Sequence, residues 1–319
     1  MKMEQVKIDG LAAGAQKICI TGHIRPDGDC TGSCLGLRRY LLDGNASSQV
    51  DVFLQPAPEV FSFLDGFDQI REYDGGRYDL CFVLDVSDPE RMGENAVCLT
   101  QADRVICIDH HVTNAGLIPE TYVKPEAAAT CELLFDLMEE EKISKKTAEC
   151  LYLGLVHDTG VFRHSNATRH TMETAGILMD KGIAHAKIIN DTFLAKTYLQ
   201  NQLLGRALVE SILFCEGRCI VSMISGRTMD FYKARHEDLE GIVDQLRVTT
   251  GVDCAIFMTE MEFRVYKVSL RSNEKVDVSR VAAYFGGGGH VRAAGCTLSG
   301  TFYDVVNNLS EQIAAQLDG

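Results

Sequence analysis

The segment that decides the fold reads Arg104-Val-Ile-Cys-Ile-Asp-His-His111. Its apolar part, residues 104–108, predicts a buried strand. A strand that ends directly in Asp109, His110 and His111 presents three metal-binding side chains at the carboxyl edge of a sheet, where open α/β sheets form their binding sites. The triplet alone is equally compatible with a polar surface cluster, so its meaning depends on the residues at the ends of the other strands.

A second predicted strand, residues 17–21, also leads into metal-binding side chains. The loop after it carries His23, Asp27 and Asp29. Gly28 allows the backbone to curl so that both carboxylates point into one pocket. The same residues are compatible with an Asp-Gly turn whose carboxylates are solvated, and for this loop taken alone that is the simpler interpretation.

Two further aspartates lie at the ends of predicted elements. Asp85 follows the apolar run 80–84, where a carboxylate is costly unless it is paired or bound to a metal. Asp88 fits the alternative role of a helix cap better than Asp85 does. Asp158 follows a predicted helix over residues 145–156, and an anion at that end opposes the helix dipole, which favours a cation nearby.

The order of predicted elements indicates an α/β protein with two domains. Strands and helices alternate in the first half, which predicts a mainly parallel sheet flanked by helices. We expect this domain over residues 1–190, a helical linker over 191–212 and a smaller α/β domain over 213–319. The last of these would contain strands at 219–224, 252–259 and 263–270, and helices at 238–247, 278–285 and 303–317.

Four consecutive glycines, Gly286 to Gly289, are the unusual feature of the second half. We predict that they precede a helix and expose backbone amides to an anion. His290 and Arg292 would then lie at the start of that helix, and Arg271 at the end of a strand would add a clamp on a phosphate. The alternative is a flexible turn, which we consider less favourable because ordering four glycines costs much chain entropy.

Composition limits the classes of function. The 319 residues carry a net charge of −14, which disfavours tight binding to long nucleic acid. No apolar run approaches the ~20 residues of a membrane span, and the first nine residues lack an apolar leader, so we expect a cytoplasmic protein. The twelve cysteines include no Cys-x-x-Cys pair and several lie in apolar runs, which argues against zinc or a disulfide framework.

The candidates of the first domain share one chemistry. Carboxylates and imidazoles without a thiolate suit Mn²⁺ or a similar cation. Six donors exceed the need of one ion, and two ions about 3.5–4 Å apart would use them all. The six are His23, Asp27, Asp29, Asp85, His110 and Asp158.

The motifs, in this order along the chain, resemble those of the DHH phosphoesterase superfamily. The four that carry the resemblance are His23-x-x-x-Asp27-x-Asp29, Asp85, Asp109-His110-His111 and Asp158-Thr-Gly. The segment 286–295 resembles the signature of the DHH-associated substrate domain. The resemblance covers nearly the whole chain, and length and layout are most similar to the nanoRNase and pAp-phosphatase branch.

This resemblance implies a role for each residue. His23 and Asp27 would hold one metal, and Asp85 would bridge it to a second metal on Asp29, His110 and Asp158. Asp85 would thereby belong to the catalytic group together with two others: Asp109 would orient the site and His111 would face the substrate phosphate. The substrate-binding residues of the second domain would be Arg271, Gly287, Gly288, Gly289, His290 and Arg292.

The implied activity is Mn²⁺-dependent hydrolysis of short oligonucleotides, of the 3′-phosphate of 3′-phosphoadenosine 5′-phosphate (pAp), or of both. A hydroxide that bridges the two metals would attack phosphorus. Two alternatives stay open: a phosphodiesterase for a signalling dinucleotide such as pApA, and a nucleotide sensor with a vestigial site. The complete donor set argues against the sensor. Short RNA or DNA, or pAp, is the expected partner, and self-association into a homodimer stays open.

Overall fold

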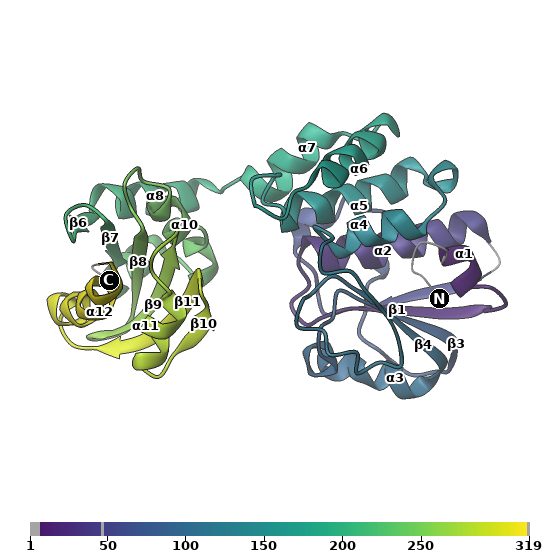
Figure 1. The fold of residues 1–319 in the computed structure, drawn as a ribbon, viewed down its shortest axis with the longest axis horizontal. Helices are drawn as coiled ribbons and strands as arrows, with labels where there is room; N and C mark the ends of the chain where they lie inside the picture. Colours follow the sequence, from purple (N-terminus) through teal and green to yellow (C-terminus); the bar gives the residue numbers. More distant parts are fainter. Residues whose placement is uncertain (1–6, 46–47, 318–319) are drawn as a thin grey trace. The chain divides into compact units, whose positions relative to one another are not determined.

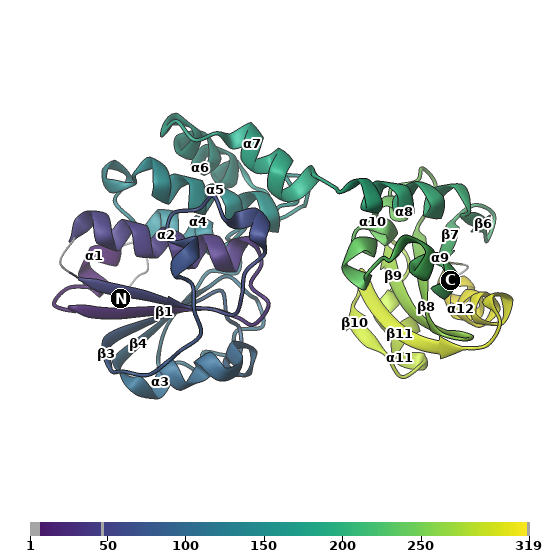
Figure 2. The same cartoon turned by 180° about the vertical axis from the view of Figure 1, so that it is seen from behind.

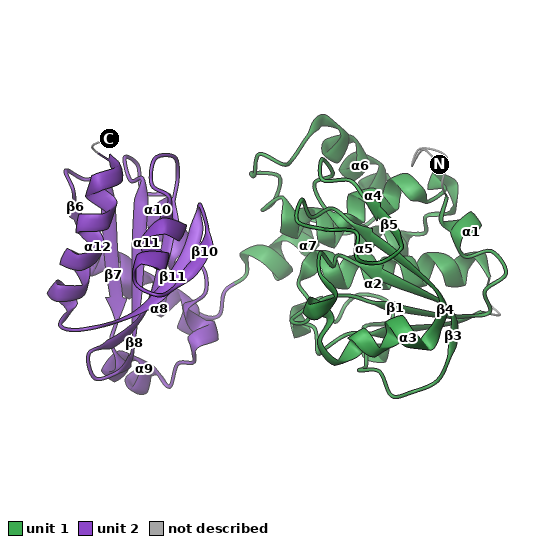
Figure 3. Ribbon diagram, turned by 60° about the horizontal axis from the view of Figure 1, so that its bottom comes forward, with its two compact units in different colours: residues 1–195 green, residues 196–319 purple. Residues whose placement is uncertain are grey.

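The computed structural model of the chain describes residues 7–45 and 48–317. They fall into two compact units, unit 1 (Met1–Ala195) and unit 2 (Lys196–Gly319), each with its own sheet (Figure 3). Residues 1–6, part of the stretch in which we expected no apolar leader, lie outside the described residues. Among the described residues, no helix is both long enough and apolar enough to cross a bilayer.

Unit 1 is organised by a five-stranded sheet in which all neighbouring strands are parallel, in the order β2-β1-β3-β4-β5. Strands of such a sheet are buried on both faces, which explains their nearly continuous apolar runs. The predicted parallel sheet flanked by helices is therefore confirmed. The strands are β1 (Lys17–Thr21), β2 (Gln49–Phe53), β3 (Tyr78–Leu84), β4 (Ala102–Asp109) and β5 (Glu120–Val123).

Helical elements cover both faces of this sheet (Figures 1 and 2). Ile20, Phe82 and other residues on one face pack against α2 (Gly28–Gly44), α4 (Thr130–Leu137) and α5 (Lys145–Asp158). The opposite face packs against η4 (Pro89–Val97) and α3 (Cys98–Gln101). The remaining elements are α1 (Ile8–Leu11), η2 (Glu59–Phe61), η3 (Phe67–Gln69), η5 (Glu140–Lys142), α6 (Arg169–Asp180), α7 (His185–Ile189) and the π-helix η6 (Asn190–Leu194).

The cysteines serve as small apolar residues of the cores. Cys19, Cys81 and Cys107 lie on adjacent strands of unit 1 and contribute to one buried cluster. All twelve cysteines are unpaired, and only Cys215 is not fully buried. Their burial fits the role of small apolar residues.

Unit 2 contains a six-stranded sheet in the order β10-β11-β9-β8-β7-β6, antiparallel except for the β7–β8 pair. Its strands are β6 (Ile212–Phe214), β7 (Cys219–Ile224), β8 (Cys254–Glu262), β9 (Val265–Ser272), β10 (Gly288–His290) and β11 (Ala293–Ser299).

Helices pack on both faces of this second sheet. On one face, α11 (Val278–Tyr284) and α12 (Phe302–Leu317) form a core with alternate strand residues. On the other face, α8 (Tyr198–Val209) and α10 (Ile242–Arg247) cover residues of β7 and β8. Two short elements complete the unit, α9 (Gly226–Tyr232) and η7 (His236–Leu239).

The segment that we expected to be a helical linker, residues 191–212, is divided between the units. Its first residues belong to the π-helix η6, which ends at Leu194. Leu203 and Ala207 of α8 are fully buried in the core of unit 2, and the hydroxyl of Ser222 donates a hydrogen bond to the carbonyl of Ala207 over 2.6 Å. Helix α8 therefore packs as part of unit 2.

The glycine run does not precede a helix, so that part of our prediction is wrong. Strand β10 begins at Gly288 and pairs with β11 as a hairpin. A side chain at Gly287 would clash with the carbonyl oxygen of Gly295, and one at Gly289 would meet the carbonyl oxygen of Ala293 at 2.5 Å. The glycines therefore allow two strands to pack closely, and the loop offers no helix N-terminus to an anion.

Candidate metal centre

The candidate side chains of unit 1 meet at one edge of its sheet. His23 lies two residues after β1, Asp85 directly follows β3, and His110 directly follows β4. Because these three strands are adjacent and parallel, their carboxyl ends lie together. The other donors come from helix ends: Asp27 and Asp29 from the start of α2, and Asp158 from the last residue of α5.

His23, Asp27 and Asp85 form the first group of donors. The Nε2 atom of His23 lies 3.7 Å from Oδ1 of Asp27 and 3.4 Å from Oδ2 of Asp85. Its Nδ1 atom lies 2.8 Å from the carbonyl oxygen of Ile24, which can only accept, so Nδ1 is the donor. Nε2 is therefore the nitrogen left to bind a cation, the usual arrangement for a histidine that holds a metal.

His110, Asp29 and Asp158 form the second group in the same way. The Nε2 atom of His110 lies 3.1 Å from Oδ2 of Asp158 and 4.0 Å from Oδ2 of Asp29. Its Nδ1 atom donates to the carbonyl oxygen of Ala127 over 3.2 Å. Both imidazoles therefore present the same nitrogen to a set of carboxylates.

Asp85 lies between the two groups. Its Oδ2 faces His23, while its Oδ1 lies 3.7 Å from Nε2 of His110 and accepts a hydrogen bond of 3.1 Å from the hydroxyl of Thr130. Its backbone has φ of +59°, a left-handed conformation that residues other than glycine rarely adopt and that clusters at functional sites. Asp85 thus offers one carboxylate oxygen to each group.

The carboxylates of this edge repel one another. Burial, and then the charges of Asp85 and Asp158, raise the pKa of Asp29 well above its usual range. Burial lowers the pKa of His110, but contacts with Asp158 and Asp29 outweigh it and raise that pKa to about 10. The arrangement therefore carries an excess of negative charge and favours a bound cation.

The residues fit a metal ion on the chemistry of their donors. Within residues 7–45 and 48–317, no lysine or arginine pairs with any of the four carboxylates at this edge. Three sets of ligand atoms lie within 4.8 Å of one another and could hold an ion: His23 with Cys30 and Asp85, Asp85 with His110 and His111, and Asp29 with His110 and Asp158.

Asp109 is fully buried and organises the histidines instead of facing the other carboxylates. Its Oδ1 accepts hydrogen bonds from Nδ1 of His111 (2.7 Å) and from the amide of His110 (2.9 Å), and its Oδ2 accepts one from Asn114 (2.8 Å). Burial opposes the charge, but His111 and Asn114 outweigh it and lower the pKa of Asp109. The same hydrogen bond raises the pKa of His111, which favours its protonated form.

Sequence reasoning missed the support that α4 gives to this edge. The amides of Thr130 and Cys131, in the first turn of α4, donate to the two oxygens of Asp29 over 2.7 and 3.0 Å. The available signal was the apolar helical pattern of residues 131–138, because the N-terminus of a helix favours a nearby anion. Sequence reasoning also missed Cys30, whose sulfur lies within 4.8 Å of ligand atoms of His23 and Asp85.

A glycine allows α5 to approach Asp29 closely. A side chain at Gly154 would meet Oδ1 of Asp29 at 2.5 Å and would clash with the sulfur of Cys131. The contact between α2 and α5 therefore leaves no room for even a methyl group beside this carboxylate.

Neighbouring polar residues have structural roles. The ring of His157 packs edge-on against Phe61 and Phe193, and its Nε2 lies 3.1 Å from the hydroxyl of Thr192. Asp88 caps η4 by accepting from the amide of Glu90, as expected from the sequence.

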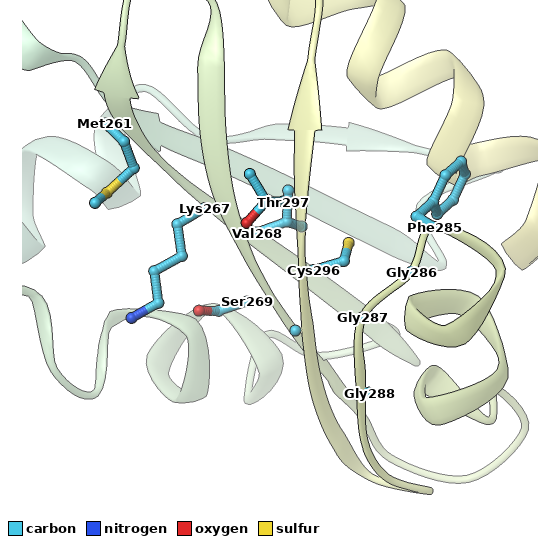
Figure 4. A pocket seen from close by; sticks show the side chains of 11 residues that line it. Met261, Lys267, Val268, Ser269, Phe285, Gly286, Gly287, Gly288, Cys296 and Thr297 are labelled. Carbon is cyan, nitrogen blue, oxygen red and sulfur yellow. The ribbon is translucent and has the colours of Figure 1, made fainter.

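The predicted substrate-binding residues of unit 2 lie on neighbouring strands and around two cavities that share Lys267 and Ser269. Gly287 and Gly288 line a cavity of about 570 Å³ (Figure 4), whereas Arg271 lines another of about 270 Å³ and pairs with Asp244 over 3.1 Å. The side chain of Arg292 donates to the carbonyl of Val276 over 3.0 Å. Three predicted residues line neither of these two cavities: Gly289, His290 and Arg292.

Comparison with known proteins identifies the family. Residues 17–155 match the DHH family, N-terminal domain, and residues 217–318 match the DHHA1 domain. The chain is 30% identical over 294 residues to the bifunctional oligoribonuclease and PAP phosphatase NrnA of Thermus thermophilus, covering 90% of this chain and 86% of that protein. The chain belongs to the DHH family of phosphoesterases, as the sequence motifs indicated.

Other relatives extend the comparison. The protein of the same name from Bacillus subtilis is 25% identical over 88% of this chain and 89% of its own length. The cyclic-di-AMP phosphodiesterase PdeA of Listeria monocytogenes is 26% identical over 90% of this chain but only 46% of that protein. The crystal structure of an exopolyphosphatase-related protein from Bacteroides fragilis matches with a TM-score of 0.83 and 27% identity, covering 95% and 93% of the two chains.

Proposed function

We propose that this phosphoesterase hydrolyses short oligonucleotides and removes the 3′-phosphate of pAp, with the help of two divalent cations, above all Mn²⁺. The observation that carries the proposal is that four carboxylates and two imidazoles meet at one edge of the sheet, with Asp85 between the other groups: Asp27, Asp29, Asp85, Asp158, His23 and His110. The NrnA proteins of Thermus and Bacillus have both activities in their names, and this chain covers most of their length, which supports the same substrates.

The residues of unit 1 would bind two cations. His23, Asp27 and Asp85 would hold one cation, and Asp29, His110 and Asp158 would hold the other together with Asp85. Bound divalent cations supply positive charge for the phosphate and make water more acidic. The positions of these six residues would determine where the cations, and therefore the phosphate, are held.

His111 is the group that we assign to the phosphate. Its Nδ1 is fixed by Asp109, so Nε2 is the nitrogen free for a ligand. Because Asp109 also favours the protonated imidazole, His111 can donate a hydrogen bond to a phosphate oxygen and stabilise the charge that develops on it. Asp109 keeps the ring in that orientation.

A substrate panel tests this function. The purified chain with Mn²⁺ is offered pAp, pApA, a short RNA of about five nucleotides, a long RNA and inorganic pyrophosphate in parallel, and the released products are quantified. We expect turnover of pAp and short RNA, with long RNA and pyrophosphate poor substrates. Removal of metal with a chelator should abolish turnover, and Mn²⁺ should restore it with about two ions per chain.

Failure of every substrate in the presence of bound Mn²⁺ would contradict the enzymatic proposal and favour a nucleotide sensor. Brisk hydrolysis of pyrophosphate would contradict the assignment to nucleotides.

A second candidate is a phosphodiesterase for a signalling dinucleotide such as pApA. The similarity to the cyclic-di-AMP phosphodiesterase PdeA favours it. In the same panel, kcat/KM for pApA at least tenfold above the values for pAp and short RNA would establish this second function instead.

A further inference from the structure

One short segment of unit 1, residues 127–131, makes hydrogen bonds around the second group of donors. It follows β5 and includes the first two residues of α4. All of its residues are buried. A buried backbone must find partners for its amides and carbonyls, so these hydrogen bonds hold the segment and its neighbours in one arrangement.

The segment contacts three of the proposed metal ligands directly. The carbonyl oxygen of Ala127 accepts the hydrogen bond of 3.2 Å from Nδ1 of His110. Two amides at the start of α4 donate to the carboxylate of Asp29, and the hydroxyl of Thr130 donates to Asp85 over 3.1 Å. The segment therefore holds ligands that come from a strand end and a helix start far apart in the sequence.

Asn166 connects the same segment to Asp158, the remaining ligand of this group. Its Nδ2 atom donates to the carbonyl oxygen of Ala128 over 3.0 Å and to the carbonyl oxygen of Asp158 over 3.2 Å. Its Oδ1 atom is buried and has no hydrogen-bond partner among the described residues. The contribution of this side chain is therefore to join the end of α5 to the segment that holds the other ligands.

Glu132 fixes the segment through the same residue, Ala128. Glu132 is the third residue of α4 and only 1% exposed, and its Oε2 atom accepts a hydrogen bond of 2.5 Å from the amide of Ala128. No lysine or arginine of the described residues pairs with it. A buried carboxylate without a cation is costly unless strong hydrogen bonds compensate. The amide and the carbonyl of Ala128 are thus both fixed by side chains.

The first group of donors lacks these contacts. Within residues 7–45 and 48–317, no hydrogen bond or ion pair joins residues 127–131 to His23 or Asp27. His23 is held by the carbonyl of Ile24, and Asp27 accepts from two amides in the first turn of α2. Apart from the shared Asp85, different parts of the chain therefore position the two groups.

We propose that Glu132 and Asn166 are positioning residues that determine the affinity of the second cation site and leave the affinity of the first unchanged. The inference rests on the proposed function, because it takes over its two cations. Outer partners hold metal ligands in place, and their loss typically lowers metal affinity by about tenfold to a hundredfold. Because residues 127–131 contact each ligand of the second site, directly or through Asn166, a shift of this segment affects these ligands together.

Mn²⁺ titrations of variants that retain one site each test the proposal. Calorimetry measures Mn²⁺ binding in His23→Ala, which keeps the second group of donors, and in His110→Ala, which keeps the first. Asn166→Leu removes the donating amide without a change of charge. It should weaken Mn²⁺ binding by about tenfold to a hundredfold in the His23→Ala background, and by no more than about twofold in the His110→Ala background.

Asn190→Leu is the matched control. Asn190 is an exposed residue of unit 1, and no hydrogen bond of its side chain to another described residue is present. The same substitution at this position should leave Mn²⁺ affinity unchanged in both backgrounds. Circular dichroism of each variant measures whether the fold is retained.

Two substitutions of Glu132 separate its hydrogen bond from its charge. Glu132→Gln keeps an oxygen that can accept from the amide of Ala128, so Mn²⁺ affinity in the His23→Ala background should stay within about threefold. Glu132→Leu leaves that buried amide unpaired, and it should weaken the second site to the same extent as Asn166→Leu. Equal losses in Glu132→Gln and Glu132→Leu would overturn the role of this hydrogen bond.

The proposal is overturned if Asn166→Leu changes Mn²⁺ affinity equally in the two backgrounds, or in neither. These titrations need no turnover, so they separate the inference from the proposed function. Two bound ions without hydrolysis of any nucleotide would contradict the proposed function, while a loss confined to the second site would still support the inference. Fewer than two Mn²⁺ ions per wild-type chain would contradict both.

Discussion

At the carboxyl edge of the unit 1 sheet, neighbouring groups fix the candidate side chains, whereas Lys267 of unit 2 has no hydrogen-bond or ion-pair partner within residues 7–45 and 48–317. Asp29 is fully buried and receives two amide hydrogen bonds, and Asp109 receives three hydrogen bonds. The cavity of unit 2 is formed instead by bare glycine backbone and an exposed strand face.

This difference indicates that the two regions have different functions. Groups held by many hydrogen bonds are suited to transition-state chemistry, because they need no reorganisation when charge develops. An open cavity with an unpaired cation is suited to binding. Substitutions in unit 1 should therefore lower kcat, and those in unit 2 should raise KM.

The largest effect should come from Asp85→Asn, which removes a charge shared by both donor groups. We expect kcat to fall by roughly a thousandfold or more, with the fold retained. Steady-state assays with Mn²⁺ and circular dichroism would measure both. Asp88→Asn is the matched control, because asparagine also caps a helix, and it should keep full activity. If kcat of Asp85→Asn stays within tenfold of the wild-type value, the assignment of catalysis to this edge of unit 1 is contradicted.

The next effect should come from Gly154→Ala, which introduces a methyl group against Asp29. Displacement of this carboxylate by a fraction of an ångström should lower kcat by roughly a hundredfold, and crowding should lower the free energy of unfolding by about 1–3 kcal/mol. Activity assays and urea unfolding would measure these changes.

Gly176→Ala in α6 is the control for that substitution, since nothing lies within 4 Å of the added methyl group. It should leave kcat unchanged and stabilise unit 1 by about 0.5–1 kcal/mol. Equal behaviour of the two variants would show that the contact with Asp29 is unimportant.

A smaller effect is expected from His290→Ala in unit 2. His290 is exposed on β10, and its loss should raise KM for the preferred substrate roughly tenfold while kcat stays close to the wild-type value. Initial rates over a range of substrate concentrations would separate the two constants. A fall in kcat without a change in KM would place His290 with the chemistry of unit 1 and remove the contrast between the units.

The smallest effect concerns stability and pH in unit 2. Asp253 accepts hydrogen bonds from the amides of Glu274, Lys275 and Val276, and these outweigh partial burial and lower its pKa below the usual value of 3.8. A lowered folded-state pKa stabilises the protein above about pH 4, and this contribution disappears as pH falls through the folded-state pKa.

Asp253→Asn should therefore destabilise unit 2 by about 1–2 kcal/mol at pH 7. The difference from the wild type should shrink when urea unfolding is repeated near pH 3.5. A difference that stays constant between these pH values would show that the charge of Asp253 is irrelevant to its role. The activity of the folded variant should be unchanged.

The candidate metal site could be predicted because each of its residues lies near the end of a strand or helix that the sequence itself predicts. An apolar run followed by Asp85 or Asp109 is a local signal, and the rule that parallel strands share a carboxyl edge brings the residues together. The supporting contacts of Thr130 and Cys131 could not be foreseen, because they depend on where α4 meets α2.

The cavities of unit 2 were harder to predict because they depend on strand pairing between distant segments. Glycines are poor strand formers, so Gly288 to His290 gave no strand signal, and their pairing with β11 is what creates the cavity. Lys267 is an ordinary exposed residue of an alternating strand until that pairing is known. Arg271 and Arg292 were predicted from their places at a strand end and after the glycine run, but their contacts with Asp244 and with the carbonyl of Val276 could not be predicted.

The left-handed backbone conformation of Asp85 implies that the stability of the fold and the proposed activity place opposite demands on this residue. Glycine adopts φ near +60° without strain, so Asp85→Gly should relieve about 1 kcal/mol of backbone strain and also remove charge repulsion from the buried edge. Part of that gain is offset by the greater freedom of glycine in the unfolded chain. Selection for thermal resistance alone would therefore tend to replace the carboxylate that we assign to both cations, so a more stable Asp85→Gly variant should be an inactive one.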